Sequence, residues 1–120
     1  MKITTRLLLT LGIIAGFAAR LSAANIVLNE LMYHPASENL SESYVEVFNA
    51  GPGTVDLTGW RFTKGIQYAF PSNTLFAPGA YLVVAADRSA FTNKYPSVTN
   101  FVAGWPAPMG SDVRLEDNTG

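Results

Sequence analysis

From residue 25 onward, apolar and polar positions form short blocks separated by turn-forming residues. The first block, Ile26–Tyr33, is apolar on both faces of a strand except at Asn29 and Glu30, and Pro35 ends it because proline cannot donate to a strand ladder. Further strands are expected at Tyr44–Phe48, Val55–Leu57, Trp60–Thr63, Ile66–Phe70, Leu75–Phe76, Tyr81–Ala86 and Val113–Glu116. A series of such short strands with frequent turns indicates an all-β fold of the β-sandwich type.

One segment departs from the strand pattern. Asp87 can cap a short helix at residues Arg88–Lys94, with Phe91 and Tyr95 on one face, and Pro96 ends it. The pattern therefore predicts a β-sandwich that carries one small helix.

The last predicted strand leads into Asp117–Gly120, which has the composition of a hairpin turn but no returning strand behind it. Such an end leaves an unpaired strand edge, which folded proteins usually cover. We therefore expect residues 25–120 to form a sandwich domain that is incomplete at its C-terminus. The alternative is a genuine end with a frayed tail.

The first 24 residues have a different pattern. Lys2 and Arg6 precede the apolar run Leu7–Ala19, and small residues follow up to Ala24. This is the three-part pattern of a secretory signal, and the apolar run is too short to span a bilayer. We expect a helical signal peptide over residues 1–24, cut after Ala24 or alternatively after Ala23, and a protein that is secreted or held in the cell envelope. The alternative is a buried core helix.

Charge separates the two parts further. The 120-residue chain has a net charge of −1, but three of its eight basic residues lie in the leader. Residues 25–120 carry five basic and nine acidic side chains, a net charge of −4. An acidic domain argues against nucleic-acid binding, which needs clustered basic residues. The absence of cysteine from the sequence excludes a disulfide scaffold and thiol chemistry.

Two carboxylates interrupt the apolar strands. Glu30 and Glu46 are expected to lie partly buried, where each needs partners. In the structural interpretation, which we favour, each accepts hydrogen bonds from backbone groups, Arg61 or Lys64 and fixes the strand register. The functional alternative is a paired-carboxylate site, either for acid–base chemistry or, with Asp56, for a hard cation.

Tyr33 and His34 border a polar loop, residues 36–43, which is a candidate binding loop. A metal site of His34, Glu38 and Glu42 on this loop is an alternative to a locally hydrogen-bonded histidine.

The two tryptophans lie in different surroundings. Trp60 is expected to anchor the core rather than to form a binding platform, because large aromatic side chains supply much of a small core. Trp105 lies in Val98–Gly110, a segment without strand periodicity that is expected to be irregular. An exposed aromatic side chain in such a loop makes a binding anchor for a sugar or a protein. The alternative is that Trp105 folds back over an open end of the sandwich.

Several of these segments together resemble the bacterial lamin tail domain family. The matching segments are residues 26–33, 44–49, 55–60, 70–71, 75–84 and 112–117. The resemblance implies an immunoglobulin-like β-sandwich that continues with another strand, and an accessory role in large exported bacterial proteins. It brings no catalytic residues with it, and fold alone does not give function.

The expected function is a non-catalytic, exported module of a larger bacterial protein, with no cofactor and no resident metal. Its partner would be an unidentified protein or a cell-envelope carbohydrate. The candidate binding residues are Trp105, His34 and Tyr33, and the residues assigned a structural role are Glu30, Glu46 and Trp60. The alternatives are an accessory domain of a secreted hydrolase, nuclease or kinase-like enzyme whose catalytic domain lies beyond Gly120, and a module stabilised by calcium.

Overall fold

A computed structural model of the chain describes residues 25–120. The signal peptide predicted over residues 1–24 lies outside the described residues. The strands are β1 (Ile26–Met32), β2 (Tyr44–Asn49), β3 (Val55–Asp56), β4 (Arg61–Lys64), β5 (Tyr68–Ala69), β6 (Leu75–Phe76), β7 (Tyr81–Ala85), β8 (Phe101–Ala103) and β9 (Arg114–Glu116). The helical elements are the 3-10 helix η1 (Leu40–Glu42) and the α-helix α2 (Arg88–Lys94). No helix among these is long and apolar enough to cross a membrane.

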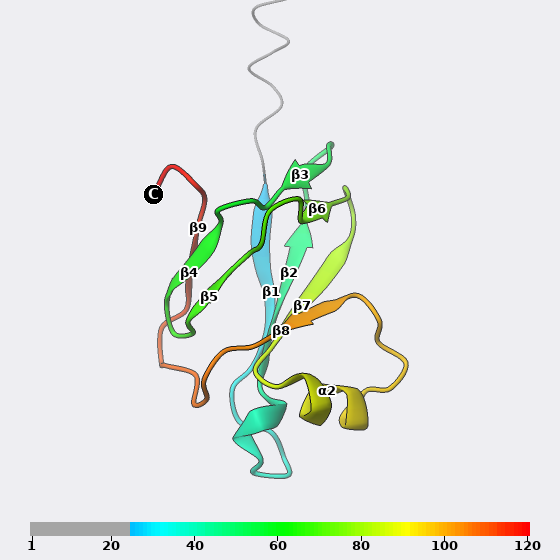
Figure 1. Cartoon of the computed structure of the whole chain (residues 1–120), viewed down its shortest axis with the longest axis vertical. Coiled ribbons are helices and arrows are strands. Elements are labelled where there is room, and N and C mark those ends of the chain that lie inside the picture. Colours follow the sequence, from blue (N-terminus) through cyan, green and yellow to red (C-terminus); the bar gives the residue numbers. More distant parts are fainter. Residues whose placement is uncertain (1–24) are drawn as a thin grey trace, which may run out of the picture.

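The strands form three sheets, with the orders β1-β2-β7-β8, β3-β6 and β5-β4-β9 (Figure 1). The core lies between the four-stranded sheet, which contributes Val45, Val47 and Val84, and the segment from β3 to β6, which contributes Leu57 and several phenylalanines. The prediction of a β-sandwich with one short helix is therefore confirmed.

Helix α2 connects β7 to β8, and these two strands pair in parallel. The expectation that residues 98–110 are irregular is wrong for Phe101–Ala103, which form this edge strand. Parallel strands need a crossover connection, and α2 supplies it. Asp87 Oδ1 accepts a hydrogen bond from Ala90 N at 2.8 Å, which confirms the predicted cap.

A buried asparagine holds the end of β2. The Asn49 side chain is fully buried; its Nδ2 donates to the carbonyl oxygens of Gly53 and Phe76 at 3.0 and 2.9 Å, and its Oδ1 accepts from Gly51 N at 3.0 Å. These bonds fasten the loop after β2 and strand β6 to the four-stranded sheet. They satisfy three polar groups that burial would otherwise leave without partners.

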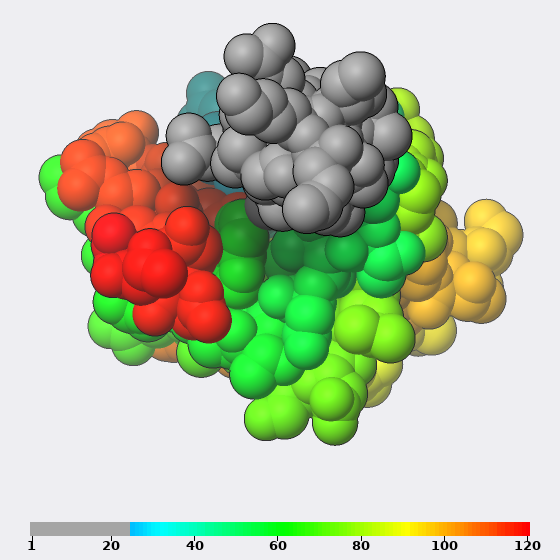
Figure 2. All heavy atoms as spheres, turned by 90° about the horizontal axis from the view of Figure 1, so that it is seen from above, coloured from blue at the N-terminus to red at the C-terminus, as the bar shows by residue number. Residues whose placement is uncertain are grey.

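Two layers of apolar side chains result, one on each face of the four-stranded sheet. Tyr44, Val83 and Ala85 point away from the sandwich core and form a second cluster with Phe91 of α2. Figure 2, a view from above, shows α2 with the residues that follow it on one side of the molecule and the C-terminal residues on the other. Tyr81, on the outer face of the same sheet, is 46 % exposed, so the helix covers only part of this face.

Candidate functional site

The alternation of side chains along β2 creates the candidate site. Val45 and Val47 point into the sandwich core, so Tyr44, Glu46 and Phe48 point to the outer face of the sheet. Tyr81 of β7 lies directly opposite Phe48 in the strand register, and the two rings stack with their centroids 4.6 Å apart. The outer face thus carries aromatic rings beside a carboxylate.

Helix α2 closes one side of this face. The ring of Phe91 meets the Tyr44 ring edge to face at 5.7 Å, and Tyr95 does the same at 5.9 Å. Between the helix and the exposed part of the sheet lies a groove of about 260 Å³. Its lining residues come from β2, β7, α2 and the α2–β8 connection: Tyr44, Glu46, Tyr81, Val83, Phe91, Tyr95, Val98 and Asn100.

The polar groups of the groove include one carboxylate and one side-chain amide. Glu46 is half-buried, and its Oε1 accepts from Asn29 Nδ2 at 2.7 Å. Asn100 Nδ2 donates to the backbone oxygen of Tyr81 at 2.6 Å, which leaves its side-chain oxygen and its second N–H for a ligand. A ligand in the groove therefore meets aromatic and apolar walls, tyrosine hydroxyls, one carboxylate and one amide.

Glu30 and Glu46 lie directly opposite each other on β1 and β2, beside the groove. A bulge at Asn29 sets this register, because Leu28 pairs with Val47 and the next pair is Glu30 with Glu46. Glu30 is exposed, so the expectation of burial is wrong for Glu30 and confirmed for the half-buried Glu46.

The hydrogen-bond partners of the two carboxylates also differ from those expected. Glu30 Oε1 accepts from the Tyr44 hydroxyl at 2.8 Å, and burial together with this carboxylate raises the pKa of Tyr44 well above its ordinary value. Arg61 and Lys64 instead face Glu116 and Asp112, with N–O separations of 3.8 and 3.4 Å. The prediction that Arg61 or Lys64 partners the two carboxylates is therefore wrong, and their side-chain hydrogen-bond donors are Tyr44 and Asn29.

Metal-binding alternatives are not assembled in this structure. Asp56 lies on β3, in a different sheet, and its Oδ1 accepts from the backbone and hydroxyl of Thr58. Within residues 25–120, no three histidine, aspartate or glutamate side chains lie close enough together to hold a metal ion. The two alternative sets, Glu30 with Glu46 and Asp56, and His34 with Glu38 and Glu42, are therefore not brought together.

The loop after β1 lies apart from the groove. Tyr33 is 67 % exposed and His34 is exposed, with the two ring centroids 6.4 Å apart. Further along, the polar loop contains η1, whose Glu42 accepts hydrogen bonds from Lys94 of α2 and from the Ser37 hydroxyl. These two donors hold the pKa of the Glu42 carboxyl below its ordinary value. The loop is thus pinned to the helix, and Tyr33 and His34 stay available as a separate surface.

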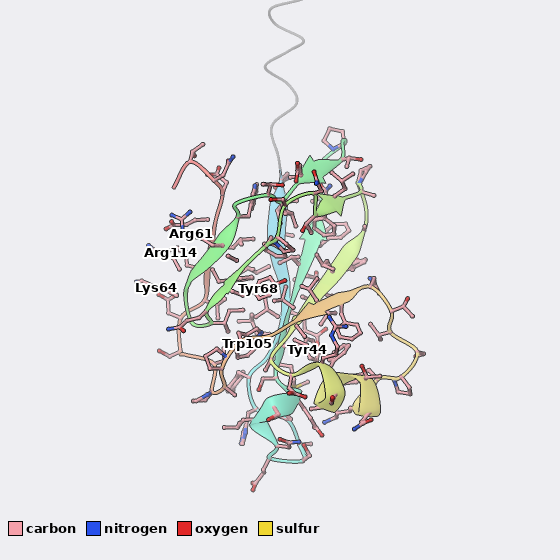
Figure 3. All side chains as sticks on the ribbon, in the orientation of Figure 1. Tyr44, Arg61, Lys64, Tyr68, Trp105 and Arg114 are labelled. Atoms are coloured by element: carbon pink, nitrogen blue, oxygen red, sulfur yellow. The ribbon has the colours of Figure 1, made fainter. Side chains whose placement is uncertain are left out.

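Trp105 is in the core rather than on the surface. Its side chain is 3 % exposed, and its Nε1 donates to the carbonyl oxygen of Val84 at 3.2 Å. Figure 3 shows the residue inside the body of the fold. The prediction of an exposed anchor is wrong, because the indole finds a buried acceptor on β7, and the alternative of a folded-back ring holds. Trp60 packs half-buried against the same core, as expected.

The sequence pattern did not predict the groove. The signal was present in the spacing Tyr44-x-Glu46-x-Phe48, which places two aromatic rings and a carboxylate on one strand face. A second hollow, between residues 63–67 and 106–110, is lined mainly by small and proline residues beside Lys64. It offers less aromatic surface than the groove.

The family model described as Lamin Tail Domain matches residues 20–120. No curated protein matches the chain.

Proposed function

Because the chain belongs to the lamin tail domain family, whose fold prescribes no chemistry, we propose that it is a non-catalytic module that binds a ligand in the groove on the outer face of the four-stranded sheet. The observation that carries the proposal is the groove's lining of three tyrosines, one carboxylate and one amide. Concave surfaces with apolar walls and a few polar groups are the usual form of binding sites.

The composition of the groove supports binding. Tyr81 is 46 % exposed and already held in place by its stack on Phe48, so a ligand that covers it orders little additional side chain. Aromatic residues of this kind contribute large contact areas at low entropic cost. The ligand would be part of another protein or of a cell-envelope carbohydrate.

The N-terminal residues support export of the domain to the compartment in which such a ligand lies. Residues 1–24 have the composition of a secretory signal, and this supports the proposal that the domain acts outside the cytoplasm or in the envelope. N-terminal sequencing of the protein recovered from an exporting bacterial host tests this part. The expected first residue is Asn25, and a recovered protein that keeps residues 1–24 would contradict it.

Binding by the groove can be tested with a matched pair of tyrosines. The full chain, Tyr81→Ala and Tyr33→Ala are titrated with a panel of short peptides and neutral oligosaccharides by calorimetry. For any ligand that binds, we expect Tyr81→Ala to weaken binding about tenfold and Tyr33→Ala to leave it within about twofold. Tyr33 is the control because it is more exposed but lies outside the groove. Equal effects, or a larger effect at Tyr33, would contradict the assignment.

A further inference from the structure

We propose, on the basis of the proposed function, that the groove is specific for a cationic side chain, a lysine or arginine presented by a partner polypeptide. The occupant is fixed by charge complementarity and by the aromatic walls. A neutral sugar and an acidic segment are the competing ligands that the test must separate.

The charge argument begins with two neighbouring carboxylates. Glu30 and Glu46 face each other across β1 and β2, and like charges placed directly opposite destabilise a strand pair. Their hydrogen-bond donors, Tyr44 and Asn29, are neutral. Within residues 25–120 the ion pairs are Arg61–Glu116, Lys64–Asp112 and Lys94–Glu42. A cation from a partner would thus compensate two carboxylates that the described residues do not.

The two basic side chains of α2 make contacts outside the groove. Lys94 points to Glu42, and the Arg88 guanidinium lies over the Phe101 ring, 4.9 Å from its centroid. Neither residue lines the groove. Figure 3 shows Arg61, Lys64 and Arg114 along β4 and β9, at one edge of the molecule and away from Tyr44. Among the residues that line the groove, Glu46 carries the only charge, and it is negative.

The aromatic walls favour the same ligand. A cation held over an aromatic ring is attracted by the negative face of its π-system, and the attraction grows when a carboxylate completes the site. Cation–ring contacts of this kind occur next to the groove within the chain itself, since Arg88 covers Phe101 and the Lys94 ammonium lies 6.0 Å from the centroid of Tyr95. A volume of about 260 Å³ is suited to one long side chain rather than to a drug-sized molecule.

The test uses the full chain and three soluble probes: a peptide of alternating lysine and glycine, the matched peptide with glutamate in place of lysine, and a neutral oligosaccharide. Calorimetry measures affinity for the wild-type chain, Glu46→Gln, Glu30→Gln, Glu116→Gln and Tyr81→Ala. Glu116→Gln is the matched control, because it removes a strand carboxylate from a different sheet, the one formed by β5, β4 and β9. Thermal melting of each variant verifies folding.

We expect the lysine peptide to bind, Glu46→Gln and Glu30→Gln each to weaken it about tenfold, and Glu116→Gln to change it by no more than about twofold. Binding should also weaken as salt is raised. If the glutamate peptide or the oligosaccharide binds more tightly than the lysine peptide, and Tyr81→Ala weakens that binding, the cationic ligand is overturned. The proposed function of the groove as a binding site is then retained. Equal effects of Glu46→Gln and Glu116→Gln, or no binding of the lysine peptide, would also overturn it. If Tyr81→Ala changes the affinity of no probe that binds, the assignment of binding to the groove is overturned as well.

Discussion

The substitution Asn49→Asp tests the hydrogen-bond argument that joins β2, β6 and the intervening loop. It replaces an amide by a carboxylate of nearly the same shape. The two bonds that Asn49 Nδ2 donates to Gly53 and Phe76 are lost, and the new oxygen faces the same two carbonyl oxygens. The bond accepted from Gly51 N is retained.

The magnitude follows from these contacts. Two lost hydrogen bonds lower the free energy of unfolding by about 2 kcal/mol. Burying a carboxylate without a cation adds about as much again, since Asn49 is fully buried. We therefore expect Asn49→Asp to reduce the free energy of unfolding by about 4 kcal/mol at pH 7.

The deficit should depend on pH in a defined direction. Burial against two carbonyl oxygens raises the pKa of the introduced carboxyl in the folded state above its unfolded value. The variant is then most stable below the unfolded pKa, and stability is lost as the pH rises through the folded pKa. The difference from wild type should accordingly shrink as the pH is lowered toward about 4.

Urea unfolding of the full chain at both pH values measures the effect. Asn93→Asp is the control, because Asn93 is exposed on α2 and should change the free energy of unfolding by no more than about 0.5 kcal/mol. The reasoning is refuted if Asn49→Asp is as stable as wild type at pH 7, or if its deficit grows at acid pH.

Three further predictions concern single contacts and are measured by urea unfolding. Tyr44→Phe should lower the free energy of unfolding by about 1 kcal/mol at neutral pH, because the bond to Glu30 is removed. Burial and Glu30 raise the pKa of Tyr44, so above pH 10 the folded wild-type protein keeps a proton that the unfolded chain releases, and its stability falls. The variant lacks this hydroxyl, so its stability should fall less above pH 10. An unchanged pH profile would contradict this. Trp105→Phe should lower the free energy of unfolding by about 2 kcal/mol, because the hydrogen bond to the Val84 carbonyl and part of the buried ring are removed. A loss below about 0.5 kcal/mol would contradict the buried position of the indole. Gly65→Ala should lower the free energy of unfolding by about 2 kcal/mol or more, since φ is +84° and the new Cβ would lie 2.5 Å from a backbone oxygen. Gly79→Ala is the control, because its new Cβ meets no atom and only backbone strain of about 1 kcal/mol is added. Equal losses of stability in the two variants would refute the steric part of the argument.

The local structure of the helix could be read from the sequence in full. Asp87 caps α2, which spans Arg88–Lys94 as predicted, and Phe91 faces the sheet. These features depend on residues within one or two helical turns of each other. Most of the strands were identifiable for the same reason, because alternation and turn residues are local signals.

Strand β8 could not be read in this way. Phe101–Ala103 is only three residues long, and its parallel pairing with β7 depends on how α2 returns the chain to the sheet. Trp105 follows it, and the burial of Trp105 depends on the Val84 carbonyl, 21 residues earlier in the chain. A single sequence does not display such distant partners.

The groove needed the fold for a related reason. The spacing of Tyr44, Glu46 and Phe48 indicates a shared face, but only the topology shows that this is the outer face and that Tyr95 comes to lie beside it. Likewise, the pairing of Glu30 with Glu46 depends on the bulge at Asn29, which no local sequence pattern indicates.

The most direct test of the groove is fluorine NMR of the full chain with fluorotyrosine at its five tyrosines. Three of them, Tyr44, Tyr81 and Tyr95, line the groove, and Tyr33 and Tyr68 do not. On addition of the lysine–glycine peptide, the signals of the three groove tyrosines should shift and those of the other two should stay in place. Shifts confined to Tyr33 or Tyr68, or no shift at all, would contradict binding in the groove.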